Sequence, residues 1–382
     1  MNATTDSVYN IICTPSELED FVRTIENEPA VGVDLEADSM YHFREKVCLI
    51  QIAARNINVV IDPLAIEDLS PLRPIFKRRD VCKIFHGADY DVRSLYRDFR
   101  ITIHNLFDTE LACRFLGFPE SGLEAVLKKK FDVALDKKFQ RKDWSKRPLP
   151  PDMIAYAAAD AKYLLPLAKN LKAELDEKNR LEWVFEECEH LSRVRPAGVN
   201  DRPIYMNFKG AGKLDSRSLA VLEALLGFRR EVARKRDKPL FRIFGNRPLL
   251  ELAAKKPLNL KQLEKTGVLS SKQINMYGRE ILTAIQGAMD LPAEELPVYP
   301  RKKAPRVSLA VVGRVKALRN WRDKQVRKLA IDPALICNKA LISTIAVHKP
   351  LKISDLAAIK EMKNWQRKEF GRHIVNVLKQ AH

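Results

Sequence analysis

Two carboxylates stand two residues apart in a stretch of sequence that is typical of a β-strand. Residues 31–38 read VGVDLEAD, in which apolar residues alternate with Gly32, Asp34 and Glu36. Side chains at positions i and i+2 of a strand lie on the same face, so Asp34 and Glu36 point the same way. Two unit charges about 4 Å apart repel by roughly 4 kcal/mol at an effective dielectric near 20, so this pair requires a cationic partner.

Two further segments place acidic residues where they can join this pair. Residues 83–99, KIFHGADYDVRSLYRDF, carry Asp91 just after an apolar, strand-like run. Residues 154–167, IAYAAADAKYLLPL, form an alanine-rich helical pattern in which Tyr156 and Asp160 are four residues apart. Residues at i and i+4 share one helix face, so the phenol and the carboxylate project into the same space. The four acidic residues that we expect to converge on one cluster are Asp34, Glu36, Asp91 and Asp160.

A cluster of carboxylates without a Cys or His set is a site for a hard cation, and we expect Mg²⁺ or Mn²⁺ rather than zinc. Two such ions roughly 4 Å apart can activate a water and stabilise the leaving oxygen in phosphodiester hydrolysis. Tyr156 could orient that water by a hydrogen bond. Because the reference pKa of tyrosine is near 10, it is a poor base, and a metal must lower the pKa of the water.

The order of these motifs resembles that of the DEDD exonuclease superfamily, in its tyrosine-bearing branch. In that branch an Asp-x-Glu motif, a central Asp and a Tyr-x-x-x-Asp motif form a two-metal site. Residues 107–118, FDTELACRFLGF, and residues 135–167, LDKKFQRKDWSKRPLPPDMIAYAAADAKYLLPL, resemble the bacterial ribonuclease D family more specifically. Each motif alone is common on protein surfaces, whereas their combination indicates a nuclease.

The resemblance implies a role for each of the five site residues. Asp34, Glu36 and Asp160 would hold the catalytic metal ion. Asp34 and Asp91 would serve the second ion, partly through water. Tyr156 would position the nucleophile.

Asp89 competes with Asp91 for the central position. We prefer Asp91 because the family pattern His-Gly-x-x-x-Asp matches His86, Gly87 and Asp91. We expect Asp108 to be structural, and we expect His86 to be a structural hydrogen-bonding histidine rather than a base.

The elements that must position these residues alternate along the first 110 residues. Strand-like runs occupy residues 8–13, 30–37, 46–54, 58–64 and 81–88. A helix is predicted to begin at Pro15, since Thr14 and Glu17 form a capping box. After residue 110 the pattern is helical, and Pro166 should kink the long run or mark a restart. We therefore predict an α/β, ribonuclease H-like exonuclease domain over residues 1–200, with a mixed sheet flanked by helices.

The remainder of the chain contains a duplication at an offset of 93 residues. The matching pairs are Phe228-Arg229 with Trp321-Arg322, Lys256-Pro257-Leu258 with Lys349-Pro350-Leu351, and Gly278-Arg279 with Gly371-Arg372. The repeat predicts two all-helical modules, at 210–291 and 306–382, joined by linkers at 193–203 and 292–305. By resemblance they are HRDC domains, small helical bundles associated with nucleic-acid binding in ribonuclease D and in RecQ helicases.

The basic charge is concentrated in this duplicated part. The net formal charge is +18, and residues 301–382 hold 20 Lys and Arg against 5 Asp and Glu, whereas residues 1–200 have a balance of −4. A basic surface attracts phosphate backbones, so we expect RNA as the partner. The family resemblance implies 3′–5′ exoribonuclease activity that releases 5′-mononucleotides, with tRNA precursors and other structured RNAs bearing single-stranded 3′ tails as substrates.

Two rival functions use the same sequence features: a DNA 3′–5′ exonuclease, and a non-catalytic RNA-binding protein on an exonuclease scaffold. RNA would be distinguished from DNA by contacts to the 2′-hydroxyl, which the sequence does not place. The six cysteines are scattered without a Cys-x-x-Cys pair, no secretory signal opens the chain, and no apolar run is long enough to span a bilayer. We therefore expect a cytoplasmic monomer that does not bind membranes.

Overall fold

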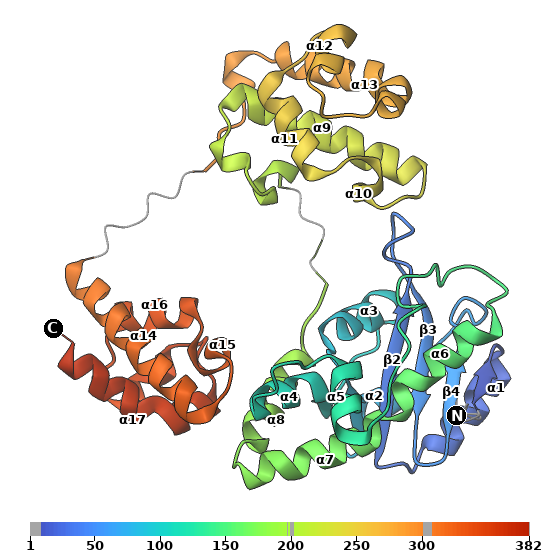
Figure 1. The fold of residues 1–382 in the computed structure, drawn as a ribbon, viewed down its shortest axis with the longest axis vertical. Coiled ribbons are helices and arrows are strands. Elements are labelled where there is room, and N and C mark those ends of the chain that lie inside the picture. The colour runs from blue at the N-terminus through green and yellow to red at the C-terminus, as the bar shows by residue number, and fades with distance from the viewer. Residues whose placement is uncertain (1–8, 197, 199–201, 301–307, 382) are drawn as a thin grey trace. The chain divides into compact units, whose positions relative to one another are not determined.

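The structure is a computed structural model that describes residues 9–196, 198, 202–300 and 308–381. It forms two compact units (Figure 1). The first unit comprises an N-terminal α/β domain and the C-terminal helical module, and the second comprises the middle helical module together with residues 38–45. Parts of both predicted linkers, residues 197, 199–201 and 301–305, lie outside the described residues.

The α/β domain is built on a six-stranded mixed sheet in the order β1-β4-β3-β2-β5-β6. The strands are Asn10–Ile12 (β1), Ala30–Ala37 (β2), Val47–Ala53 (β3), Asn58–Ile61 (β4), Cys82–Phe85 (β5) and Leu106–Asp108 (β6). β3 runs antiparallel to β2 and β4, and the other neighbouring pairs are parallel. The predicted mixed sheet is confirmed. The sequence did not reveal β6, because three residues are too few to show a period of two.

Helices flank this sheet and connect its strands, as predicted (Figure 1). They are Pro15–Ile25 (α1), Leu72–Lys77 (α2), Asp89–Phe99 (α3), Thr109–Leu116 (α4), Leu123–Phe131 (α5), Pro151–Lys162 (α6), Leu164–Glu177 (α7) and Leu181–Leu191 (α8). The capping box at the start of α1 is present: the Thr14 side chain accepts a hydrogen bond from the Glu17 amide, and Glu17 accepts one from the Thr14 amide.

The predicted interruption near Pro166 is a restart of the helix. α6 ends at Lys162, and α7 begins two residues later with Pro166 as its third residue. In the first turn of a helix the backbone N–H has no intrahelical acceptor, so a proline there loses no hydrogen bond. The break separates α6, which carries Tyr156 and Asp160, from α7, whose buried leucines belong to the core of the domain.

The two helical modules repeat one architecture. The middle module contains Ile204–Asn207 (η1), Ala211–Lys213 (η2), Ser216–Lys235 (α9), Leu240–Ile243 (α10), Asn246–Lys255 (α11), Leu260–Lys265 (α12), Ser271–Met289 (α13) and Ala293–Glu295 (η3). The C-terminal module contains Leu309–Leu329 (α14), Pro333–Cys337 (α15), Lys339–His348 (α16), Ile353–Ala358 (η4) and Asn364–Gln380 (α17).

Equivalent positions of the two helical modules have the same structural roles. Lys256 and Lys349 end α11 and α16 in the left-handed conformation, with φ of 49° and 47°. Gly278 in α13 and Gly371 in α17 lie where a Cβ would come within 3.1–3.3 Å of neighbouring side chains, so both glycines allow close packing. Two of the three sequence matches therefore mark a helix end and a close packing contact in each copy.

The C-terminal module packs directly on the α/β domain, which the sequence analysis did not anticipate. The rings of Trp183 on α8 and Trp365 on α17 stack with centroids 4.7 Å apart and an interplanar angle of 20°. Glu186 of α8 accepts hydrogen bonds from the backbone amides of Asn364 and Trp365, at 2.6 and 2.8 Å. A carboxylate from one part thus caps the first turn of a helix from the other, and the two parts share one hydrophobic core.

Candidate active site

The central strand β2 presents Asp34 and Glu36 on one face, as predicted. Val31, Val33 and Leu35 are buried on the opposite face. Gly32 precedes the acidic pair, and a Cβ at that position would lie 3.0 Å from the Ala161 carbonyl oxygen at the end of α6. A side chain there would push α6 away from β2, so the glycine permits the close approach of helix and strand that the site requires.

Small residues let α6 lie flat against the sheet. Ala157, Ala158 and Ala161 are fully buried, and Asn58 of β4 donates a hydrogen bond of 2.9 Å from Nδ2 to the carbonyl oxygen of Ala158. This packing directs the neighbouring face of α6, which carries Tyr156 and Asp160, toward the acidic end of β2. The alanine-rich composition therefore sets both the helix and its distance from the strand.

Helix and strand bring three of the predicted carboxylates together. Asp34, Glu36 and Asp160 each offer an oxygen atom, and these oxygens lie within 4.8 Å of one another. All three line a cleft of about 760 Å³ that Tyr156 also borders. Within the described residues, no Lys, Arg or His forms an ion pair with any of the three.

Burial raises the pKa values of all three groups, and the like charges of neighbouring carboxylates raise those of Glu36 and Asp160 further. Burial raises the pKa of Asp34 to about 6. Burial and the charge of Asp34 raise the pKa of Asp160 to about 8. Burial and the charges of Asp34, Asp160 and Asp91 raise the pKa of Glu36 well above its usual value. Without a bound cation the cluster therefore holds protons at neutral pH.

Asp91 lies on α3, outside the group of three but within its electrostatic reach. It is buried, and burial together with the charges of Asp34 and Asp108 raises its pKa well above the usual value. The competing residue Asp89 is instead exposed and accepts hydrogen bonds of 2.8 and 3.0 Å from the Arg93 guanidinium. The geometry thus favours Asp91 over Asp89 as the central acidic residue.

Asp108 and His86 make the structural contacts expected of them. Asp108 accepts hydrogen bonds from the amides of Gly87 and Ala88, at 3.0 and 2.9 Å, and also caps the start of α4. It thereby holds the turn from which α3 and Asp91 begin. His86 Nδ1 pairs with the Thr109 hydroxyl at 2.9 Å, and burial lowers its pKa.

Tyr156 is held by aromatic residues that the sequence analysis did not single out. The Trp144 ring stacks on it at 6.1 Å, and the Phe139 ring meets it edge-on at 5.8 Å. Arg147 anchors this segment by two hydrogen bonds to Asp62, at 2.6 and 2.7 Å. Burial and the nearby carboxylates raise the pKa of Tyr156, so the phenol stays protonated at neutral pH.

Gln51 is a further residue that the sequence did not reveal. It lies directly opposite Asp34 in the pairing of β2 with β3 and is fully buried. Its side-chain amide has no hydrogen-bond partner among the described residues. Only the strand register places it beside Asp34, since a lone glutamine in an apolar run carries no signal of its own.

The donor set fits hard divalent cations. It offers carboxylate oxygens only, the ligands that Mg²⁺ and Mn²⁺ prefer, and its like charges lie too close together to be ionised without compensation. Asp34, Glu36 and Asp160 are the residues that would hold such an ion, with Asp91 close by.

Comparisons with known proteins match all three parts of the chain. Residues 9–176 match the 3′-5′ exonuclease family, and residues 218–285 and 312–378 each match the HRDC domain. Ribonuclease D of Desulfotalea psychrophila is 31% identical over 343 residues, which are 88% of this chain and 91% of that protein. The chain belongs to the ribonuclease D family. It is therefore a hydrolase of the 3′–5′ exoribonuclease class, and the predicted family, fold and HRDC modules are confirmed.

Solved structures of the family share this architecture. The crystal structure of Escherichia coli RNase D superposes with a TM-score of 0.74 at 25% identity and covers 98% of this chain and 99% of that chain. The catalytic core of RRP6 from Trypanosoma brucei matches with a TM-score of 0.63 at 29% identity and covers 76% of this chain and 81% of that chain. The likeness to the ribonuclease D structure thus includes both helical modules.

Among the described residues, no helix combines the length and the apolar character needed to cross a bilayer. No two of the cysteines that the structure describes form a disulfide.

Proposed function

We propose that this protein removes nucleotides one at a time from RNA 3′ ends and releases 5′-mononucleotides, with Asp34, Glu36, Asp91 and Asp160 as ligands of two Mg²⁺ or Mn²⁺ ions. The observation that carries the proposal is the convergence of Asp34, Glu36 and Asp160 without a cationic partner among the described residues. Bound divalent ions would supply Lewis-acid activation of water and stabilisation of the leaving oxygen.

The carboxylates would bind the cations, and Tyr156 would orient the attacking water. Asp34 and Glu36 on β2 and Asp160 on α6 draw the cations to one point between strand and helix. The protonated Tyr156 phenol donates a hydrogen bond that orients the attacking water. Its pKa is raised, so it does not take up the proton of that water.

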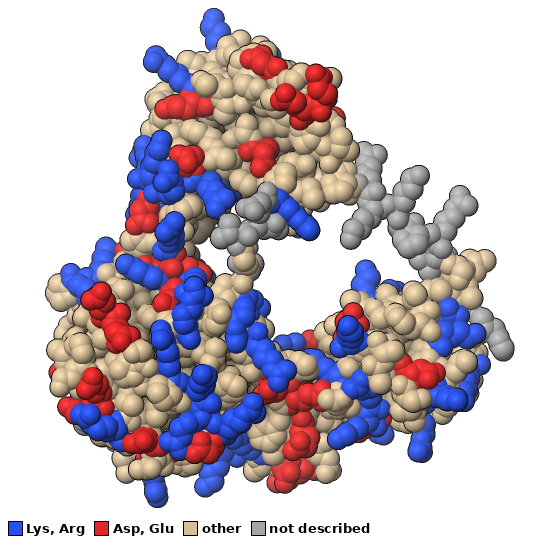
Figure 2. Space-filling view, turned by 180° about the vertical axis from the view of Figure 1, so that it is seen from behind, with Lys and Arg blue, Asp and Glu red and all other residues tan. Residues whose placement is uncertain are grey.

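The substrate we propose is structured RNA with a single-stranded 3′ tail, including tRNA precursors. The structure of E. coli RNase D is titled as that of an exoribonuclease involved in structured RNA processing. Figure 2 shows Lys and Arg side chains on the surface of each part of the chain. In the sequence, residues 301–382 contain 20 Lys and Arg against 5 Asp and Glu. The basic modules would bind the folded RNA body while the tail enters the acidic cleft.

The test is digestion of a 3′-extended tRNA by the full chain with Mg²⁺, beside a DNA oligonucleotide with the same tail sequence. Stepwise release of nucleoside 5′-monophosphates from the RNA supports the proposal. Endonucleolytic fragments, or faster degradation of the DNA, would contradict it. We also propose that the enzyme acts as a cytoplasmic monomer, and sedimentation equilibrium of the full chain tests the monomeric state.

A further inference from the structure

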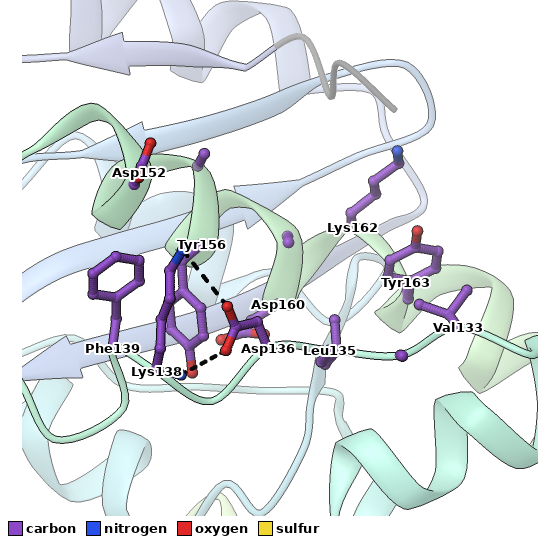
Figure 3. Close-up of a pocket in the computed structure, with 13 residues that line it drawn as sticks. Val133, Leu135, Asp136, Lys138, Phe139, Asp152, Tyr156, Asp160, Lys162 and Tyr163 are labelled. Carbon is purple, nitrogen blue, oxygen red and sulfur yellow. Dashed lines mark hydrogen bonds and ion pairs between the residues drawn. The ribbon is translucent and has the colours of Figure 1, made fainter. Parts of the chain in front are cut away.

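The middle helical module contains an apolar pocket that has no part in the chemistry described above. The pocket of Figure 3 belongs to the nuclease site, because Tyr156 and Asp160 line both that pocket and the acidic cleft. None of the residues that line the apolar pocket borders the acidic cleft. The volume of the apolar pocket is about 500 Å³, within the range of pockets that bury small ligands.

Two neighbouring helices and the chain that flanks them line this pocket. α9 and α13 pack against each other in the middle module (Figure 1) and contribute most of the lining residues. Pro203 and Tyr205 at η1, together with Leu291, Glu295 and Pro297 after α13, contribute the rest. Most of these side chains are small or apolar, so an occupant would bury apolar surface there.

Small residues on both helices keep the pocket open. Ala220 and Ala224 are four residues apart on α9, and Ala284 and Ala288 are four apart on α13, so each pair lies on one helix face. Gly287 also lines the pocket, and a Cβ at this position would have no described atom within 4 Å. A longer side chain at Gly287 would therefore project into empty space in the pocket.

Hydrogen bonds hold the walls of the pocket in place. Glu223 of α9 accepts bonds of 2.9 Å from the backbone amides of Ile204 and Tyr205, and so fixes η1 to α9. Arg217 of α9 donates a bond of 2.7 Å to the carbonyl oxygen of Leu291, which fixes the chain that follows α13. Because these segments are already ordered, a ligand would lose little binding free energy to ordering them.

The charge of the pocket is opposite to that of its module. Residues 201–292 contain 18 Lys and Arg against 9 Asp and Glu. The charged residues that line the pocket are nevertheless Glu223 and Glu295, and no Lys, Arg or His is among its described lining residues. A phosphate would meet negative charge there, whereas a guanidinium or ammonium group could pair with either carboxylate. The charges therefore favour a cationic, partly apolar occupant over RNA.

The C-terminal module provides an internal comparison. At the offset of 93 residues, Glu223 corresponds to Lys316 and Gly287 corresponds to Gln380. The second copy thus has the opposite charge at the first position and a long side chain at the second. The acidic wall and the open glycine are particular to the middle module, and the shared architecture of the two copies does not require them.

We propose that this pocket is a docking site for a partner protein, which inserts one large apolar side chain and places an arginine or lysine beside Glu223 or Glu295. Buried aromatic anchors and arginines are the residue types that contribute most to protein interfaces. The inference goes beyond the proposed function, because it assigns to the middle module a binding partner other than RNA.

The test measures binding of defined peptides to the full chain by fluorescence anisotropy. The probe is a short fluorescein-labelled peptide with one tryptophan between two arginines. Two matched peptides replace the tryptophan by serine or both arginines by glutamate. We expect the probe to bind with a Kd below about 1 mM, and each replacement to raise Kd at least about 10-fold.

Gly287→Leu tests the pocket itself. It fills the pocket from α13 and replaces a helical glycine by a better helix former, so the module should fold, which circular dichroism checks. It should raise the Kd of the probe at least about 10-fold. Glu295→Lys, at an exposed lining position, should remove most of the preference for the arginine peptide over the glutamate peptide.

Gly227→Leu is the matched control. Gly227 lies on α9, where an added Cβ would also have no described atom within 4 Å, but it does not line the pocket. This variant should bind the probe with a Kd within about twofold of the wild type.

Three results would each overturn the proposal. They are a probe that does not bind at about 1 mM, equal binding of the tryptophan and serine peptides, and a Kd that Gly287→Leu leaves unchanged. A labelled single-stranded RNA that Gly287→Leu weakens and Gly227→Leu does not would assign the pocket to nucleic acid, and would also overturn it. None of these measurements depends on RNA hydrolysis, so the docking site and the proposed function fail separately.

Discussion

Substituting Asp160 by asparagine should stabilise the metal-free protein while it destroys the enzyme. The change keeps the size of the side chain and removes one of three carboxyl groups whose oxygens lie within 4.8 Å of one another, and which therefore cannot all be ionised. Two unit charges at this distance repel by about 3.5 kcal/mol at an effective dielectric near 20.

The pKa of Asp160 leads to a similar magnitude. Its pKa is raised from 3.8 to about 8, so at pH 7 the folded protein binds a proton that the unfolded chain does not. Each pH unit is worth about 1.4 kcal/mol, which sets an upper bound of roughly 4 kcal/mol on the penalty that the asparagine removes. We expect a gain of about 2 to 4 kcal/mol in the free energy of unfolding without metal.

Tryptophan fluorescence is a suitable assay because it reports only on the compact unit that holds the site. The four tryptophans, at positions 144, 183, 321 and 365, all lie in that unit. In EDTA at pH 7 the melting temperature of Asp160→Asn should exceed that of the wild type by at least about 4 °C, since 1 kcal/mol corresponds to roughly 2–4 °C for a unit of this size. Added Mn²⁺ should raise the wild-type value and leave the variant unchanged.

Asp20→Asn serves as the control. Asp20 lies on α1, is exposed and pairs with Arg23, so its loss should change stability by less than about 0.5 kcal/mol and leave RNA hydrolysis intact. The reasoning is refuted if Asp160→Asn melts below the wild type in EDTA, if Mn²⁺ still stabilises it, or if it hydrolyses RNA at the wild-type rate.

Three further outcomes test other parts of the account. Tyr156→Phe should lower kcat about 10- to 100-fold and keep the Mn²⁺-induced rise in melting temperature, because it removes the phenol hydroxyl and no metal ligand. An unchanged kcat would exclude a role of Tyr156 in orienting the attacking water. Gly32→Ala should lower the free energy of unfolding by about 1–3 kcal/mol and lower kcat, because the added Cβ would lie 3.0 Å from the Ala161 carbonyl oxygen. Unchanged stability and activity would show that β2 and α6 need not approach so closely. In EDTA, the free energy of unfolding of the wild type should fall as the pH rises from 5 to 8. The pKa values of Asp34 and Asp160 are about 6 and about 8 in the folded protein, so these groups hold protons there that the unfolded chain releases near pH 4. Saturating Mg²⁺ should weaken this pH dependence, and equal slopes with and without metal would count against the cluster as the metal site.

The sequence predicted the parts of the site that depend on local periodicity. The strand period placed Asp34 and Glu36 on one face, and the helix period placed Tyr156 and Asp160 on another. The capping box at Thr14 and the restart near Pro166 were equally local features. The convergence of strand and helix was a hypothesis from these two patterns, which the family resemblance strengthened, since spacing alone does not bring residues about 120 positions apart together.

What the sequence did not reveal depends on tertiary contacts. Gln51 lies beside Asp34 only through the register of β2 with β3, and Trp144 supports Tyr156 only because tertiary packing stacks the two rings. The contact between Trp183 and Trp365 joins residues that belong to separate predicted modules. No periodic pattern encodes such pairings, because the residue types alone do not show which side chains come into contact in the fold.

The most direct test of the central claim is anomalous diffraction from Mn²⁺ in crystals of the full chain. The account predicts a metal peak coordinated by oxygens of Asp34, Glu36 and Asp160, and a second peak between Asp34 and Asp91. Ordered Mn²⁺ elsewhere in the protein with no peak among these carboxylates would contradict it.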